Sequence, residues 1–155
     1  MTDAVDTALD RCLAALRDAL YASAALYGWP AYSRFDALPA EGAYVALLAE
    51  PEESSATIGE DGRLLCVPAS VAVRLVCDCD DPAAPAFQGA RAAVARALAD
   101  TPALVADGVG AVVQYRGERA AGADASRLVA EFSLYVLVPG LAPGDRQTAK
   151  PLTRS

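Results

Sequence analysis

The residues with the clearest capacity for chemistry lie together in the stretch Cys77-Asp78-Cys79-Asp80-Asp81. Thiolates and carboxylates are ligands for zinc and other metals. Alternation along an extended strand, however, directs the Asp78 side chain away from the two thiols, and the chain contains no histidine. The spacing also matches none of the usual zinc patterns. We therefore predict no metal site and no cofactor.

Two further cysteines, Cys12 and Cys66, bring the total to four. Cys12 fits the apolar side of a helix, while Cys77 and Cys79 fall on the same side of one strand. We expect buried, reduced thiols of a protein made in a cytoplasm rather than a disulfide framework.

The lack of histidine also bears on catalysis. It removes Ser-His-Asp and Cys-His arrangements, and with them the commonest general base at physiological pH. No other catalytic motif is recognisable in the chain. We predict that the protein is not an enzyme.

The chain carries a formal net charge of −7. Proteins that grip nucleic acid usually have a basic patch that displaces counterions from phosphate. The acidic balance argues against such a protein, but it suits a protein that DNA passes without sticking. The apolar runs are too short for a membrane span, and Arg11 and Arg17 lie among aspartates, unlike a signal peptide. We expect a soluble, unsecreted protein with no membrane partner.

A chain of 155 residues is the size of one domain, which we place at residues 1–139. The remaining residues, 140–155, lack periodicity and carry Arg146, Lys150 and Arg154 against the single Asp145. Alone, such a segment should be disordered. We expect it to form an extended basic arm that reaches an adjacent copy.

The Cys-Asp stretch is positioned by a strand that precedes it and a helix that follows it, between Ser70 and Asp100. The apolar set of the strand should face the helices and comprises Val71, Val73, Leu75, Cys77 and Cys79. The alternate set is mixed and comprises Ala72, Arg74, Val76 and Asp78. Asp81 and Pro82 are predicted to cap and begin the helix, with Pro85 as an alternative start.

Periodicity and turn residues define the other elements. The N-terminal helix repeats apolar residues at steps of three and four: Val5, Leu9, Cys12, Leu13, Leu16 and Leu20. The predicted elements besides the central strand and helix are a helix over Thr2–Leu26 and strands over Ala43–Glu50, Arg63–Val67, Val109–Arg116 and Arg127–Val138. The class is α+β, a mainly antiparallel sheet of about five strands with two helices on one face, in the order α-β-β-β-α-β-β.

Three connections separate these elements. Tyr27–Gly42 holds the only tryptophan, and we expect its aromatic residues to plug the end of the core, with a subunit interface as the alternative. Pro51–Gly62 is a long acidic loop, and a loop of this kind is either simply solvated or functional. Gly117–Ser126 is expected to be a flexible loop.

One face of the predicted sheet has no helix left to cover it. In the last strand this face carries Arg127, Val129, Glu131, Ser133, Tyr135 and Leu137, while Leu128 and its alternate residues face the helices. Ala72, Arg74 and Val76 join it from the central strand. A face that is partly apolar, partly charged and uncovered predicts packing against another subunit.

The order of elements resembles that of the tail terminator and tail completion proteins of tailed phages and related contractile particles. The resemblance rests on the central strand, its Asp-Asp-Pro turn, the Ala-rich helix that ends near Asp100, and the closing strands that end in EFSLYVLVPG. It covers residues 1–140 in topology, and Val71–Leu98 and Arg127–Val138 in sequence texture. It implies a homo-oligomer, a hexameric ring that caps the tail tube, ends its polymerisation and joins the tail to the head connector.

The same resemblance implies partners and contacts. The partners would be the tail tube or sheath protein and the head-tail connector protein, with DNA only as passing cargo. The location would be the tail of a virion assembled in the host cytoplasm. The candidate interface residues are Glu52, Glu53, Glu60, Asp61, Arg74, Arg116, Arg119, Glu131, Tyr135, Arg146, Lys150 and Arg154.

Two other classes of protein stay open at this point. One is a small dimeric α+β ligand-binding domain or enzyme of unknown substrate, with Tyr115, Arg116 and Glu131 lining a pocket. The other is an adaptor that docks a partner helix. Sixfold particles would favour the ring, and saturation by a small metabolite would favour the ligand-binding domain.

Overall fold

The computed structural model describes residues 2–26, 28–33, 36–79, 81–99, 103–104, 110–124 and 127–140. In chain order the elements are α1 (Thr2–Leu20), the 3₁₀ turn η1 (Ala24–Leu26), β1 (Ala31–Tyr32), β2 (Tyr44–Pro51), the 3₁₀ turn η2 (Glu53–Ser55), β3 (Thr57–Ile58), β4 (Leu64–Cys77), α2 (Pro85–Ala99), β5 (Ala103–Leu104), β6 (Ala111–Asp124) and β7 (Arg127–Pro139). None of the helices in these residues has the length and apolarity that crossing a membrane requires.

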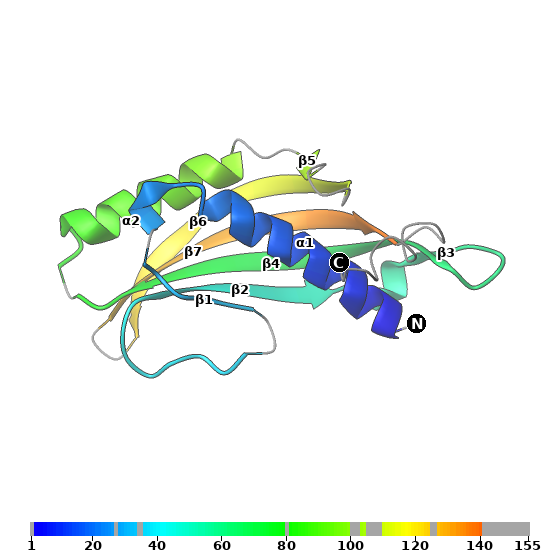
Figure 1. The fold of residues 1–155 in the computed structure, drawn as a ribbon, viewed down its shortest axis with the longest axis horizontal. Coiled ribbons are helices and arrows are strands. Elements are labelled where there is room, and N and C mark those ends of the chain that lie inside the picture. The colour runs from blue at the N-terminus through cyan, green and yellow to red at the C-terminus, as the bar shows by residue number, and fades with distance from the viewer. Residues whose placement is uncertain are drawn as a thin grey trace.

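The strands form one sheet in the order β1-β2-β4-β7-β6-β5, and β3 pairs with β4 beside this path. β1 runs parallel to β2, and the other described pairs are antiparallel. Both helices lie on one face of the sheet (Figure 1), which we call the closed face. The predicted α+β class, with a mainly antiparallel sheet and two helices on one face, is confirmed.

The core fills the space between the helices and the closed face. The apolar stripe predicted on α1 is buried over its whole length, with each of its six residues at most 2% exposed. α2 buries Phe87, Ala90, Val94 and Leu98, and the central strands contribute Val71, Val73, Leu75, Phe132 and Leu134. Each fully buried side chain of this size contributes about 1.5–3 kcal/mol of transfer free energy.

The first helix is shorter than predicted, because α1 ends at Leu20 rather than at Leu26. The Ser23 amide bonds to the Leu20 carbonyl, and the Ser23 hydroxyl accepts from the Ala25 amide at 3.3 Å. A serine that bonds to nearby backbone in this way competes with helix continuation. The chain then turns as η1, which brings Leu26 into the core at 0% exposure.

A single strand, β4, replaces the two strands predicted over Arg63–Val67 and Ser70–Cys79, and it passes through Pro68. Proline is rare in a central strand because it has no N–H to donate. The Pro68 carbonyl accepts from the Glu52 amide at 2.8 Å, so its nitrogen faces the β2 side. The β2 ladder ends there, with Pro51 opposite Ala69 as its last pair, and the pairing with β7 is undisturbed.

The region Gly117–Ser126, predicted as a flexible loop, is strand as far as Asp124 and pairs with β7. Its register shifts between Tyr115 and Gly117 and again between Arg119 and Gly122. Such bulges reset the alternation of side chains, which conceals the strand from a periodicity argument. Gly117 has φ +103°, a conformation that favours glycine.

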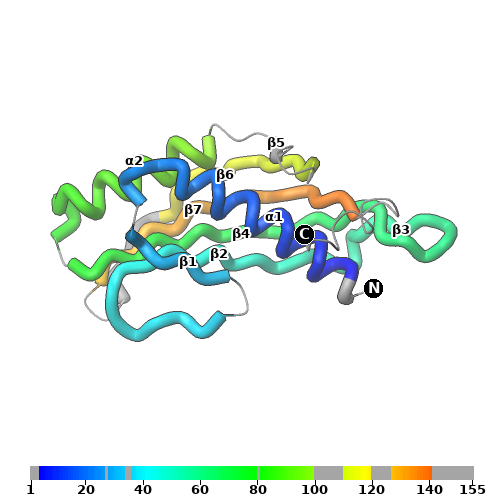
Figure 2. Tube along the Cα trace, viewed as in Figure 1, coloured from blue at the N-terminus to red at the C-terminus, as the bar shows by residue number. Residues whose placement is uncertain are grey.

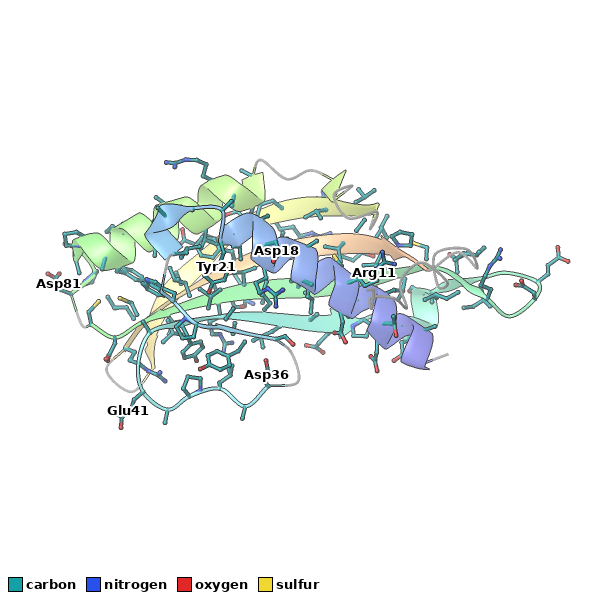
Figure 3. All side chains as sticks on the ribbon, viewed as in Figure 1. Arg11, Asp18, Tyr21, Asp36, Glu41 and Asp81 are labelled. Atoms are coloured by element: carbon teal, nitrogen blue, oxygen red, sulfur yellow. The ribbon has the colours of Figure 1, made fainter. Side chains whose placement is uncertain are left out.

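The central helix begins at Pro85, so the alternative start is confirmed and the start at Pro82 is wrong. Asp81 instead closes the turn that precedes the helix (Figure 3). Its carboxylate accepts from the Ala83 amide at 3.0 Å, and its carbonyl accepts from the Ala84 amide at 2.9 Å. Pro85 then occupies the first helical position, where no N–H is needed.

The connection before β2 follows the edge of the sheet and forms β1, which the sequence did not predict (Figure 2). Trp29 packs against the main core as expected, and the Tyr21 hydroxyl donates to its carbonyl. Tyr32 lies on the other face of the sheet and makes an edge-to-face contact with Tyr44, with the ring centroids 5.7 Å apart. Tyr27 and Phe35 lie outside the described residues.

Candidate assembly surface

The face of the sheet opposite the helices, which we call the open face, is defined by strand register. Cross-strand partners share a face. The open-face rows across β4, β7 and β6 include Arg74-Glu131-Arg119, Ala72-Ser133-Gly117, Ser70-Tyr135-Gln114 and Pro68-Leu137-Val112. The face predicted for Glu131, Ser133, Tyr135 and Leu137 is therefore the one that the structure gives them.

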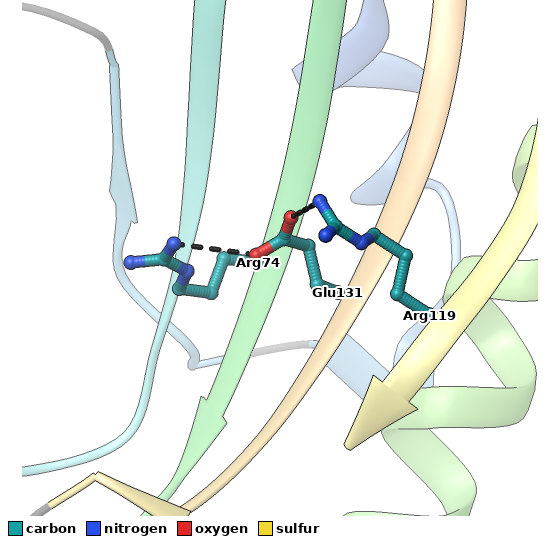
Figure 4. A network of polar contacts seen from close by, with 3 residues as sticks. All are labelled: Arg74, Arg119 and Glu131. Atoms are coloured by element: carbon teal, nitrogen blue, oxygen red, sulfur yellow. Dashed lines mark hydrogen bonds and ion pairs between the residues drawn. The ribbon is translucent and has the colours of Figure 1, made fainter. Parts of the chain in front are cut away.

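The centre of the open face is an ion network over three adjacent strands (Figure 4). Glu131 on β7 accepts from Arg74 on β4 at 3.2 Å and from Arg119 on β6 at 3.2 Å. The side chains of Glu131, Arg74 and Arg119 are 20%, 37% and 71% exposed. One carboxylate thus serves two guanidinium groups, so the network carries a net positive charge at the surface.

Next to this network the open face combines a third arginine with apolar side chains. The Arg116 guanidinium stacks 4.9 Å from the centre of the Tyr135 ring, a cation–π distance, and lies 3.5 Å from the Gln114 side-chain carbonyl. Val112 and Leu137 pair beside it and are 54% and 40% exposed. A surface with guanidinium, aromatic and exposed aliphatic groups has the composition of a protein interface.

The other end of the open face is covered by the chain itself. Tyr44, Ala46 and Val76 form a small buried cluster there, with Tyr32, Leu48 and Val129 against it. Arg127, 6% exposed, donates to the carbonyls of Pro39 and Gly42 and stacks on the Tyr44 ring. The prediction that Val76 belongs to an uncovered face is wrong, because the segment before β2 folds over this end.

The acidic loop contains more structure than predicted. η2 and β3 lie within it, and β3 pairs with the start of β4. The four acidic residues predicted as contacts, Glu52, Glu53, Glu60 and Asp61, are all exposed. Figure 1 shows the β3 part of this loop projecting beyond the end of the sheet, whereas Glu52 lies at the base of the loop, where its amide donates to the Pro68 carbonyl at 2.8 Å.

The Cys-Asp stretch that suggested metal chemistry is the end of a strand. The Cys79 thiol donates to the Cys77 sulfur at 3.3 Å, and burial together with this hydrogen bond raises the pKa of Cys77 to about 11. Burial likewise raises the pKa of Cys12 to about 11. Among the described residues no group of three or more histidine, cysteine or carboxylate side chains gathers for a metal ion. Asp80 lies outside them.

The pocket suggested for a ligand-binding domain does not form from the residues proposed for it. Tyr115 packs toward the helices, where burial raises its pKa, while Arg116 and Glu131 lie on the open face. A cavity of about 210 Å³ lies elsewhere, between α1 and the β1 edge, and its polar lining includes Asp10, Arg17 and Asp36.

Sequence reasoning placed Arg127 on this face without its partners, and it missed Gln114 and Val112 as parts of the surface. Alternation with Glu131 was enough to place Arg127 on the open face, but its partners lie 85 and 88 residues away in the chain, where no local pattern points to them. Gln114 and Val112 were within reach of the same alternation argument. The predicted arm residues Arg146, Lys150 and Arg154 lie outside the described residues.

Known proteins resemble this chain in fold, and the sequence comparisons found no match. No family model matches the chain, and no curated protein does. A chain from the virion of a native gene transfer agent particle is similar in structure, with a TM-score of 0.57 at 20% identity, over 82% of this chain and 93% of that chain. A second solved structure, whose name describes no activity, has a TM-score of 0.54 at 18% identity, over 92% of this chain and 98% of that chain. These likenesses establish that the chain has a fold that a virion protein also uses.

Proposed function

We propose that this chain is a structural virion protein that forms a ring at the end of the tail tube, ends tail polymerisation and joins the tail to the head connector. The observation that carries the proposal is the shared fold with a chain of the gene transfer agent virion, which spans 93% of that chain. A likeness over 82% of this chain and 93% of that chain supports a common architecture rather than a shared fragment. The role is non-enzymatic.

The open face supports the proposal, because a ring needs a surface on which each subunit meets the next. Arg74, Arg116, Arg119, Glu131 and Tyr135 supply that surface. The acidic hairpin, with Glu52, Glu53, Glu60 and Asp61, supplies a second one. The tail tube or sheath protein and the head-tail connector protein are the further partners.

The net charge of −7 supports a role around DNA rather than on it. A ring through which DNA passes as cargo benefits from a wall that repels phosphate. Assembly would take place in the host cytoplasm, and the finished protein would reside in the virion tail.

Electron microscopy of the purified full chain tests the proposal directly. We expect sixfold rings, and we expect the chain to copurify with tube protein when the two are expressed together. A stable monomer or dimer that saturates with a small metabolite would overturn the proposal.

The basic arm gives a second test. Gly140 donates to the Leu65 carbonyl at 2.9 Å, so a deletion of residues 141–155 leaves this backbone contact in place. We expect the truncated chain to keep its far-ultraviolet circular dichroism and melting temperature but to assemble less well, because Arg146, Lys150 and Arg154 are lost. An unchanged oligomer mass would contradict the assigned role of the arm.

A further inference from the structure

We propose that the acidic hairpin of one copy, residues 52–61, docks on the open face of the next copy at Arg116, Tyr135 and Leu137. This rests on the proposed ring and names the contact that closes it. The occupant of the open face is therefore a second copy of this chain.

Charge complementarity is the first step. At the centre of the open face Arg74, Arg116 and Arg119 outnumber Glu131 and the exposed Glu50, which lies opposite Ser70 on β2, although the whole chain is strongly acidic. Glu131 already accepts from Arg74 and Arg119. Arg116 has no carboxylate partner among the described residues, and its contacts are the Tyr135 ring and a 3.5 Å amide contact. Arg116 is thus available for an incoming carboxylate.

The acidic hairpin is held in a form suited to docking. The Gly59 amide donates to the Arg63 carbonyl at 2.8 Å and the Gly62 amide to the Gly59 carbonyl at 2.9 Å, which closes the tip. The Asp61 carboxylate accepts from the Arg63 amide at 3.0 Å. Because the tip is already ordered, less conformational entropy is lost on binding.

Apolar surface distinguishes a protein partner from DNA. Guanidinium groups would also attract phosphate, but Val112 and Leu137 form an exposed aliphatic pair beside Arg116. The hairpin presents Ile58, 39% exposed, among its carboxylates. A segment that offers both an aliphatic side chain and acids matches the open face better than a phosphate backbone does.

Topology makes the contact one between different copies. The tip of the hairpin projects past the end of the sheet (Figure 1). A contact that joins two different patches is heterologous, and it gives a ring where the rotation between copies closes and an open filament where it does not. The inferred pairing is compatible with the proposed ring when that rotation closes.

Charge reversal on each side tests the inference with the full-length chain. The variants are R116E/R119E on the open face and E53R/E60R on the hairpin. R17E/R96E, on the exposed sides of α1 and α2, is the matched control for the first variant. R116E alone removes no ion pair among the described residues. It therefore tests the contact even if the double variant folds poorly.

Assembly is measured as oligomer mass by light scattering and sedimentation, with circular dichroism and melting temperature as checks of the fold. We expect each reversal to raise the protein concentration needed for assembly by about 100-fold or more, because it brings like charges together in the contact. R17E/R96E should assemble as the wild type does. Mixing the two reversed variants in equal amounts should restore rings, because acid and base then alternate around an even number of subunits.

The outcomes separate this inference from the proposed function. If R116E/R119E and E53R/E60R both form rings as the wild type does, the docking contact is overturned and the proposed ring is not. Rings that persist in R116E/R119E while tube-protein or DNA binding is lost would also overturn it, because the open face would then serve another partner. A wild-type chain that never assembles, alone or with tube protein, would overturn both.

Discussion

The two faces of the sheet are formed by the same strands but differ in burial and in polarity. On β7 the closed-face residues Phe132, Leu134 and Val136 are at most 1% exposed, while their open-face neighbours Glu131, Ser133 and Tyr135 are half-buried. The closed face is apolar over its buried centre and is covered by both helices, and Glu118 on β6 pairs with Arg91 on α2 at its margin. The open face keeps charge at its centre and apolar groups at one edge. The comparison separates what stabilises the domain from what is available to a partner.

The largest expected loss of stability comes from a substitution on the closed face. Phe132→Ala should lower the free energy of unfolding by about 3–5 kcal/mol, because a fully buried aromatic ring leaves a cavity. Tyr135→Ala, three residues away on the open face, should lower it by about 1 kcal/mol or less. Urea denaturation of both variants measures the difference. Similar losses at the two positions would mean that the open face is part of the core.

Most of the closed face was predictable from sequence, because strict alternation and a helical stripe leave few other arrangements. Val71, Val73 and Leu75 on β4 and the stripe of α1 follow directly from the period of two and the period of 3.6. The limits of the strands were not predictable in the same way. Pro68 and the bulges near Gly117 interrupt the pattern, and only the pairing with β7 reveals that the strands continue.

The open face was predictable in position but not in its contacts. Alternation placed Arg74 and Glu131 on it, and the structure shows that they meet. The covering of Val76 depends on Arg127 and the Pro39–Gly42 segment, which are far apart in the chain. Such contacts come from tertiary structure, so no local residue pattern encodes them.

The second expected effect is a loss of stability at high pH, because the buried Cys12 thiol of α1 resists ionisation. Burial raises the pKa of Cys12 to about 11, from an unfolded-state value near 9.0. A raised pKa stabilises the fold below the unfolded value, and that stability is lost as pH rises toward the folded value. Between pH 9 and 11 the wild type should therefore lose about 2–3 kcal/mol through this thiol.

Cys12→Ala isolates this contribution. The variant is less stable at pH 7 because it leaves a small cavity, but its free energy of unfolding should fall less steeply between pH 9 and 11. Cys77, whose pKa is also raised to about 11, contributes in the same direction in both proteins and cancels in the comparison. Parallel curves for wild type and variant, measured by denaturation at each pH, would contradict the assignment.

The third effect tests the covered end of the open face. Arg127→Met keeps much of the buried aliphatic stem but removes the donations to the Pro39 and Gly42 carbonyls. We expect a loss of about 1.5–3 kcal/mol, the range for hydrogen bonds of a charged group. Limited proteolysis should cut the Pro39–Gly42 segment faster than in the wild type. Arg116→Met is the control, and it should change neither result.

The smallest effect lies at the centre of the open face, in the network of Arg74, Glu131 and Arg119. Exposed ion pairs contribute about 0.2–1 kcal/mol. Arg119 is 71% exposed and Arg74 only 37%, so the Arg74–Glu131 pair should have the larger coupling energy. Double-mutant cycles with alanine at low salt measure both couplings, and the Arg119 coupling should be the first to vanish as salt is added.

Equal couplings, or a larger one for Arg119, would show that the network acts as a single unit of the fold. A negligible coupling for Arg119 would have a different meaning, because its guanidinium could then leave Glu131 for a neighbouring carboxylate without loss of stability. The buried apolar side chains of the closed face, such as Phe132 and Leu134, have no such freedom. The coupling energy between Arg119 and Glu131 therefore measures how much this open-face contact contributes to the stability of the fold.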